Sequence, residues 1–162
     1  MNAPSPSGLL VIGVGNPDRG DDGLGPALVD ALGGDAVPGL TLDAAYQLSL
    51  EHAADVSAHR AVLFVDASAG GEAPCSLRPI AADGAAGYST HVMPPEAVLA
   101  VCELAFGRVP EAWLLGVRGY DFEPGRTLSG AARANLAPSL AVAREFIAAA
   151  LTAGPGVPEE AR

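Results

Sequence analysis

The amino-acid sequence predicts a three-layer α/β/α sandwich built on a mostly parallel, twisted sheet. Short apolar runs, of the kind that parallel strands bury on both faces, alternate with segments whose apolar residues recur every three or four positions, as in helices. The chain has 162 residues, of which 49% are hydrophobic, and this size suits one hydrophobic core. We therefore expect a single domain over residues 1–162, with flexible tails at 1–7 and 153–162.

The first half of the chain opens with a continuous apolar run that Gly15-Asn16-Pro17 interrupts, which is typical of a buried strand followed by a turn. A second buried run ends at Asp66. The predicted elements are, in order, a strand over 9–14, a helix over 23–32, a short strand over 40–42, a helix over 48–56 and a strand over 61–65. This alternation of strands and helices favours a parallel sheet.

The second half of the chain continues the pattern with one difference, a strand that is expected at the edge of the sheet. The predicted elements are an edge strand over 75–80, a loop over 81–90, a helix that starts near Pro94-Pro95 and runs to about 106, a strand over 112–117 and a helix from 128 to about 151. Pro138 should kink or split the last helix, because proline removes a backbone hydrogen bond.

The composition excludes several function classes. Nineteen acidic and nine basic residues give a net charge of -10, which opposes binding to nucleic acid or to anionic membranes. All nine basic residues are arginine, so no lysine is present to form a Schiff base or to bind phosphate. Cys75 and Cys102 lie too far apart for a metal-binding pair, and we expect both to be core residues. Without a basic, apolar leader the chain is expected to be cytoplasmic.

The turn after the first strand is the first candidate site. It carries Asp18, Asp21 and Asp22 beside glycines that allow close backbone approach. Two like charges 4 Å apart cost on the order of 4 kcal/mol at an effective dielectric constant of 20. A helix dipole returns only about 0.3–1 kcal/mol, so the turn is unsuited to a pyrophosphate. It suits a cation or proton chemistry, and the alternative is an ordinary aspartate-rich helix cap.

Two further residues are candidates for the same site. Asp66 ends a buried strand, which places it at the carboxyl edge of the sheet, where such folds bind ligands. His91 lies between a glycine-rich loop and a helix start, whereas His52 and His59 fall in or just after a helix. Taken singly, Asp66 could be a turn residue and His91 an ordinary loop histidine. Together with Asp22 they form a donor set that suits a divalent first-row metal.

Three motifs in the sequence carry a resemblance to a known family. The segment from Gly13 to Pro26 reads Gly-x-Gly-Asn, four intervening residues, two acidic residues and Gly-x-Gly. Phe64-Val65-Asp66-Ala67 and Ser89-Thr90-His91 follow in order, and Phe122-Glu123-Pro124-Gly125 with Leu128-Ser129 precedes the last helix. In these features the chain resembles the endopeptidases that mature the large subunit of nickel-iron hydrogenases, over about residues 9–151.

The resemblance implies a phosphorylase/hydrolase-like sandwich and an aspartate-dependent peptidase that removes the C-terminal extension of the nickel-loaded large-subunit precursor. It implies that Asp22, Asp66 and His91 are the catalytic residues and the metal ligands. Asn16 would contact the substrate, and Asp43, which is followed here by two alanines where many relatives have two glycines, is a secondary candidate for this role. Nickel would arrive with the precursor, although other divalent metals could occupy the site in vitro. The protein is expected to be a monomer.

Two alternatives stay open from the sequence. A nickel-site assembly partner would bind the precursor without cutting it. A peptidyl-tRNA-hydrolase-like α/β hydrolase also has a Gly-Asn-Pro turn after an apolar strand, but the acidic turn and the net charge argue against a nucleic-acid substrate.

Overall fold

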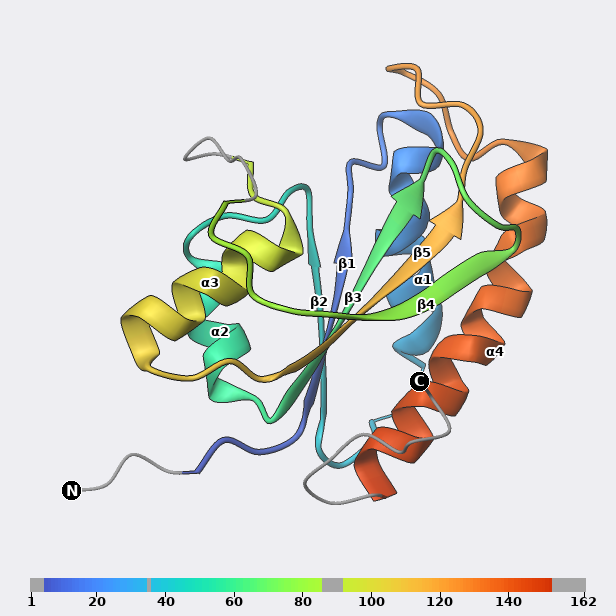
Figure 1. Cartoon of the computed structure of the whole chain (residues 1–162). Helices are drawn as coiled ribbons and strands as arrows, with labels where there is room; N and C mark the ends of the chain where they lie inside the picture. The colour runs from blue at the N-terminus through green and yellow to red at the C-terminus, as the bar shows by residue number, and fades with distance from the viewer. Residues whose placement is uncertain (1–4, 35, 86–91, 153–162) are drawn as a thin grey trace.

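A five-stranded sheet forms the middle layer of the computed structural model, which describes residues 5–34, 36–85 and 92–152 (Figure 1). The strand order is β2-β1-β3-β5-β4, and the first four strands in that order are parallel. β4 pairs antiparallel with β5 at one edge, as expected for residues 75–80. The strands are β1 (Leu9–Val14), β2 (Leu40–Ala45), β3 (Ala61–Ser68), β4 (Cys75–Ile80) and β5 (Glu111–Arg118).

Helices cover both faces of the sheet and complete the predicted three layers (Figure 1). One face carries α1 (Leu24–Leu32) and α4 (Gly130–Thr152), and the other carries α2 (His52–Ala58) and α3 (Pro95–Phe106). A short 3-10 helix, η1 (Gly20–Gly23), leads into α1. Gly25 at the start of α1 packs against the carbonyl oxygens of Val14 and Val65, where any Cβ atom would overlap them. This close packing seats α1 directly on the ends of β1 and β3.

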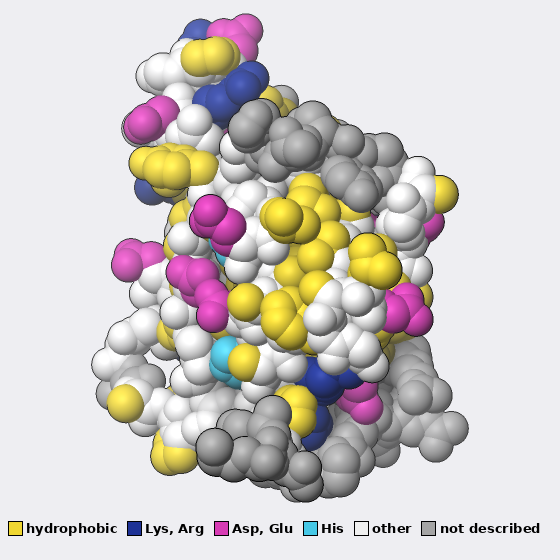
Figure 2. All heavy atoms as spheres, turned by 90° about the vertical axis from the view of Figure 1, so that its left-hand side faces the viewer, with side chains coloured by type: hydrophobic (Ala, Val, Ile, Leu, Met, Phe, Trp, Pro, Cys, Tyr) yellow, Lys and Arg dark blue, Asp and Glu magenta, His cyan; other side chains and the backbone are white. Residues whose placement is uncertain are grey.

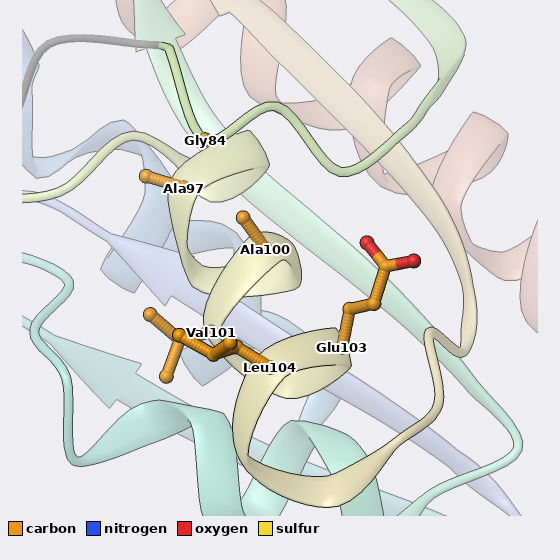
Figure 3. A pocket seen from close by; sticks show the side chains of 6 residues that line it. All are labelled: Gly84, Ala97, Ala100, Val101, Glu103 and Leu104. Atoms are coloured by element: carbon orange, nitrogen blue, oxygen red, sulfur yellow. The ribbon is translucent and has the colours of Figure 1, made fainter.

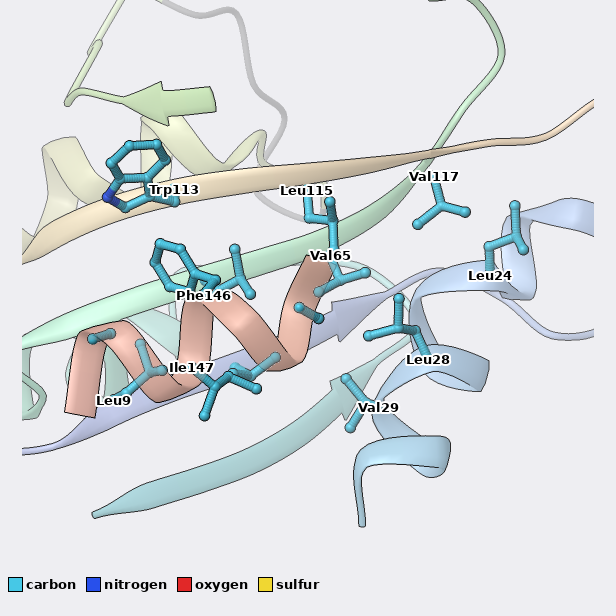
Figure 4. Packing of buried hydrophobic residues seen from close by; sticks show 14 of the residues in the cluster. Leu9, Leu24, Leu28, Val29, Val65, Trp113, Leu115, Val117, Phe146 and Ile147 are labelled. Atoms are coloured by element: carbon cyan, nitrogen blue, oxygen red, sulfur yellow. The ribbon is translucent and has the colours of Figure 1, made fainter. Parts of the chain in front are cut away.

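Alternating side chains of the central strands fill two hydrophobic clusters, one on each face. On β1, Leu9 and Val11 pack toward α1 and α4, whereas Leu10 and Ile12 pack toward α2 and α3. Figure 4 shows the first cluster, in which Trp113 of β5 lies beside Phe146 of α4 with ring centroids 5.6 Å apart. A pair of this kind contributes about 0.5–1.5 kcal/mol beyond its buried area. Every residue of β1 is buried, as its continuous apolar run predicts.

Three element boundaries differ from the sequence prediction by three residues or more. β2 is longer than expected and ends at Ala45, and β3 continues through Asp66 to Ser68. The helix expected over 48–56 is wrong at its start, because α2 begins only at His52. The backbone N–H of Ser49 donates to Nδ1 of His52 at 3.0 Å and closes a turn before the helix. Leu48 lies before this turn and is buried in the core. Its apolar side chain therefore reflects core packing and not a position in a helix.

The helix is not split at Pro138, since α4 continues through it from Gly130 to Thr152. Pro138 is exposed, so water can reach the backbone carbonyl that the proline leaves without a partner. By length and composition α4 could cross a membrane. However, Phe146 and Ile147 pack into the core cluster, which is the behaviour of a core helix in a globular protein. Cys102, as expected, is fully buried in the core on the opposite face.

Candidate active site

The ends of β1 and β3 meet at one rim of the sheet, where the first strand leads into the acidic turn. These strands are parallel neighbours, with Gly13 opposite Val65. Asp66 is the next residue of β3 and therefore stands level with the end of β1. Asp22 lies in η1, which a short loop joins to that end. The structure thus brings these two predicted site residues together at the carboxyl rim of the sheet, where parallel sheets bind their ligands.

The loop between β1 and η1 holds the Asp22 carboxylate in place. The backbone N–H of Asn16 donates to Oδ2 of Asp22 at 2.7 Å. The side chain of Asn16 is used within the loop, because its Oδ1 accepts the N–H of Asp18 at 2.9 Å. Gly15 has a φ of 143°, and any Cβ atom on it would overlap the carbonyl oxygen of Asp22. The Gly-Asn pair is therefore needed for the loop to close around this aspartate.

Asp66 is a partly buried acid with a perturbed pKa. Burial raises the pKa of its carboxyl to about 6, and the negative charge of Asp22 also raises it, while a hydrogen bond from the backbone N–H of Ala67 opposes the shift. That hydrogen bond is 2.8 Å long. The charge of Asp22 therefore reaches Asp66, in keeping with the position of both residues at one rim of the sheet. Two adjacent carboxylates at a rim attract a cation or share a proton, which is the chemistry of a metal-binding or acid-base site.

Asp21, although next to Asp22, does not join this pair. Its side chain is completely buried. Its Oδ2 accepts the backbone N–H groups of Tyr120 and Asp121 at 2.7 and 2.9 Å. Ser129 donates both its backbone N–H and its hydroxyl to the same carboxylate. Burial alone would raise the pKa of Asp21, but the hydrogen bonds outweigh it and lower the pKa.

The three carboxylates of the turn therefore do not form one acidic cluster. Asp21 is a structural residue that ties η1 to the segment before α4, and the exposed Asp18 contributes backbone contacts to the loop. A buried carboxylate must be hydrogen-bonded, and donors that lie about a hundred positions away satisfy this one. Only Asp22 of the three is brought beside Asp66.

His91, the third predicted ligand, lies outside the described residues. The chain is described again from Val92, and Met93 donates its backbone N–H to the carbonyl of Leu48 at 3.1 Å. Met93 is buried in the same cluster as Phe64, on the face toward which Asp66 also points by strand alternation. Over residues 5–34, 36–85 and 92–152, no three potential metal-ligand side chains gather in one place.

Asp43, the secondary substrate candidate, does not reach the rim. It lies on β2 opposite Ile12 of β1, two residues before the level of Val14. At about 3.3 Å per residue and about 4.8 Å between strands, it lies roughly 12 Å from the position of Asp66. Its Oδ1 accepts the backbone N–H of Ala44 at 2.8 Å. Asp43 is exposed and separate from the pair formed by Asp22 and Asp66.

An apolar surface with a pocket lies over α3, away from the carboxylates. Apolar side chains gather on the face that α2 and α3 cover (Figure 2), and Leu104 of α3 is 90% exposed. A pocket of about 350 Å³ over α3 is shown in Figure 3, and its lining residues are Gly84, Ala97, Ala100, Val101, Glu103 and Leu104. None of them belongs to the loop after β1 or to β3, so this pocket is not part of the carboxylate site.

Fold and site together define an α/β protein with a pair of carboxylates at the carboxyl rim of its sheet. No protein-family model and no curated protein sequence matches the chain. Solved structures do match it over most of its length. The hydrogenase maturating endopeptidase HybD from E. coli superposes with a TM-score of 0.70 at 22% identity, covering 96% of this chain and 99% of that one.

Two archaeal structures give the same result. A hydrogenase 2 maturation peptidase from a Thaumarchaeota archaeon matches with a TM-score of 0.62 at 25% identity, over 85% of this chain and 96% of the other. The [NiFe] hydrogenase maturation protease HycI from Thermococcus kodakarensis KOD1 matches with a TM-score of 0.67 at 20% identity, over 90% and 95%. The chain therefore has the α/β fold of [NiFe] hydrogenase maturation proteases, as its motifs predict.

Proposed function

We propose that this protein is the endopeptidase that removes the C-terminal extension of a nickel-loaded [NiFe]-hydrogenase large-subunit precursor. The observation that supports the proposal is that Asp22 and Asp66 lie at the same rim of the sheet, where the charge of Asp22 raises the pKa of Asp66. The similarity of the fold to maturation proteases from bacteria and archaea supports it. The motif Ser89-Thr90-His91 supports His91 as the third member of the site.

The two carboxylates provide a place for a divalent ion that arrives with the substrate. The charge of Asp22 raises the cost of charge on Asp66, and a cation between the two carboxylates would relieve that cost. Two oxygen donors and one imidazole contain no thiolate, so they bind nickel weakly by themselves. Nickel that is already held by cysteines of the precursor would find its remaining ligands here. Binding then depends on loading of the precursor, and unloaded precursor is left uncut.

The residues of this chain have separate tasks in the proposed reaction. Asp22 is held by the Asn16 N–H and contributes a fixed negative charge. Asp66, with a pKa near 6, is mostly ionised at pH 7 and is suited to accept a proton close to the reacting bond. An ion held by these residues would activate water or polarise the scissile carbonyl. Asn16 and the exposed Asp43 remain proposed substrate contacts, with Asp43 about two strands away from the reacting bond.

The same proposal covers the partner of the protein, its oligomeric state and its location in the cell. The precursor is the partner, and the protein works as a cytoplasmic monomer. The net charge of -10 disfavours nucleic acid and anionic membranes as partners. Other divalent ions could occupy the two carboxylates in vitro, since hard oxygen donors accept several metals.

The proposal is tested by substitution at the three site residues. We expect Asp22→Ala, Asp66→Ala and His91→Ala to fold but to leave nickel-loaded precursor at its full length on a denaturing gel. Asp30→Ala is the matched control, because Asp30 is an exposed carboxylate on α1 outside the site. Normal processing by the Asp22 or the Asp66 variant would contradict the assignment.

A further inference from the structure

The pocket beside Asp22 is separate from the carboxylates and has a different character. It has a volume of about 220 Å³, which corresponds to roughly seven waters at about 30 Å³ each. It lies where the loop after β1, the first turn of α1 and the end of β2 come together. Its lining residues are Gly15, Pro17, Pro26, Ala44, Ala45 and Tyr46.

Gly15 connects this pocket to the carboxylate site. Its N–H donates to the carbonyl oxygen of Ala45 at 2.9 Å, which joins the loop to the end of β2. On its other side, a Cβ atom on Gly15 would lie 3.5 Å from the carboxyl carbon of Asp22. One residue thus separates the pocket from the proposed reacting group. A peptide whose scissile bond reaches Asp22 places a neighbouring side chain within reach of the pocket.

The lining determines what kind of side chain the pocket accepts. None of its six residues is charged, and the side chains are two prolines, two alanines and one tyrosine beside the glycine. Tyr46 lines the pocket and is 69% exposed, so its side chain is accessible to a bound group. A charged side chain of either sign would lose water on entering the pocket, and none of the lining residues could pair with it.

We infer that this pocket is the specificity subsite of the protease and receives an uncharged, apolar side chain of medium size next to the scissile bond. The inference rests on the proposed function and adds to it the residues that select the cleavage sequence. Ala44 and Tyr46 determine the size of the side chain that fits. Burial of an apolar side chain against this lining contributes binding free energy in proportion to the area removed from water.

The test uses nickel-loaded precursors in which the residue on either side of the scissile bond is Gly, Ala, Val, Leu, Arg or Asp. At one of the two positions, we expect the wild-type enzyme to cut the Val and Leu precursors with a kcat/KM at least about 10-fold above that for Gly, Arg and Asp. Ala44→Leu fills the pocket and should reverse the order in favour of Gly and Ala, mainly through KM. Tyr46→Ala widens the pocket and should weaken the preference for Val and Leu.

Controls separate a specificity effect from a folding effect. Ala105→Leu adds the same atoms at an exposed position of α3, outside the pocket, and should keep the wild-type order. Thermal unfolding of each variant checks that the fold is retained. If wild-type enzyme prefers Arg at both positions, or if folded Ala44→Leu keeps the wild-type order, the subsite assignment is wrong while the protease function stands. If wild-type enzyme cuts no precursor of the series, the proposed function itself fails.

Discussion

The carboxylate of Asp21 accepts hydrogen bonds from both the backbone N–H and the hydroxyl of Ser129, at 2.7 and 2.8 Å. Ser129 stands immediately before α4, and its hydroxyl oxygen accepts the N–H of Ala132 at 3.2 Å, which caps the helix. One buried side chain therefore connects η1, the segment at Tyr120 and the start of α4. This connection fixes the next residue, Asp22, at the rim of the sheet.

Asp21→Asn should destabilise the protein, because the amide has only one acceptor oxygen. Its NH2 group would face the N–H and hydroxyl donors that now bind the carboxylate. We expect the free energy of unfolding to fall by about 2–4 kcal/mol, as for other buried charged acceptors that lose their partners. Urea denaturation measures this change. Asp18→Asn, at an exposed position of the same turn, is the control and should alter the stability by less than about 0.5 kcal/mol. A change at Asp21 as small as that of the control would contradict the structural role.

Asp66→Asn should make the protein more stable at pH 8. The pKa of Asp66 is raised to about 6 in the folded protein from an ordinary value of 3.8. Between these pH values the folded state holds a proton that the unfolded chain has lost, so wild-type stability falls as pH rises from about 4 to about 6. After allowance for partial exposure to water, the gain at pH 8 should be roughly 1–2 kcal/mol, and it should vanish below about pH 4.

Urea titrations of both proteins between pH 3.5 and pH 8 measure this difference. The amide oxygen of the replacement can still accept the N–H of Ala67, so that hydrogen bond is matched in the two proteins. A variant less stable than wild type at pH 8 would show that Asp66 is not under electrostatic strain. Stability gained at the expense of activity is common where a site keeps charges close together.

Asp22→Asn should lower the pKa of Asp66, because it removes a neighbouring negative charge. The pKa should stay above its ordinary value, since burial, the larger cause, is unchanged. Carboxyl-carbon NMR of labelled aspartate follows this titration directly. Asp30→Asn, at an exposed position of α1, should leave it as it is. An Asp66 titration that is the same in the Asp22 variant and in wild type would place the two carboxylates too far apart to share an ion.

Gly15→Ala should disrupt the site from the backbone. The residue needs a positive φ, and the added methyl group overlaps the carbonyl of Asp22. We expect a loss of about 2 kcal/mol or more in stability together with loss of precursor processing. Gly34→Ala is the control, because it adds the same methyl group at a position where nothing lies within 4 Å of the added atom. If both variants process the precursor equally well, the loop does not position Asp22 as described.

The layered fold is predictable from the sequence because its central strands are apolar throughout. Leu9 to Val14 is buried at every position, and the order of strands and helices leaves few arrangements for a parallel sheet. The position of Asp22 and Asp66 at one rim follows from the same rule, since Asp66 comes after the apolar part of β3 and Asp22 after β1. The resemblance in the motifs also led to the correct fold.

The remaining features depend on contacts between distant residues. A local sequence does not reveal which aspartate of the turn points inward, because the donors to Asp21 lie at Tyr120 and beyond. The start of α2 is set by a turn at Ser49, although Leu48 has the apolar character of a helix position. Pro138 is tolerated because it lies on the exposed face of α4, which the composition of the helix does not disclose.

The most direct test measures the peptide that leaves the precursor. Purified protein is mixed with nickel-loaded precursor or with the same precursor stripped of nickel, and the released C-terminal fragment is weighed by mass spectrometry. The account predicts a single fragment from the loaded precursor and none from the stripped one, even with excess enzyme. Binding of the loaded precursor without release of a fragment, or equal cleavage of both forms, would contradict it.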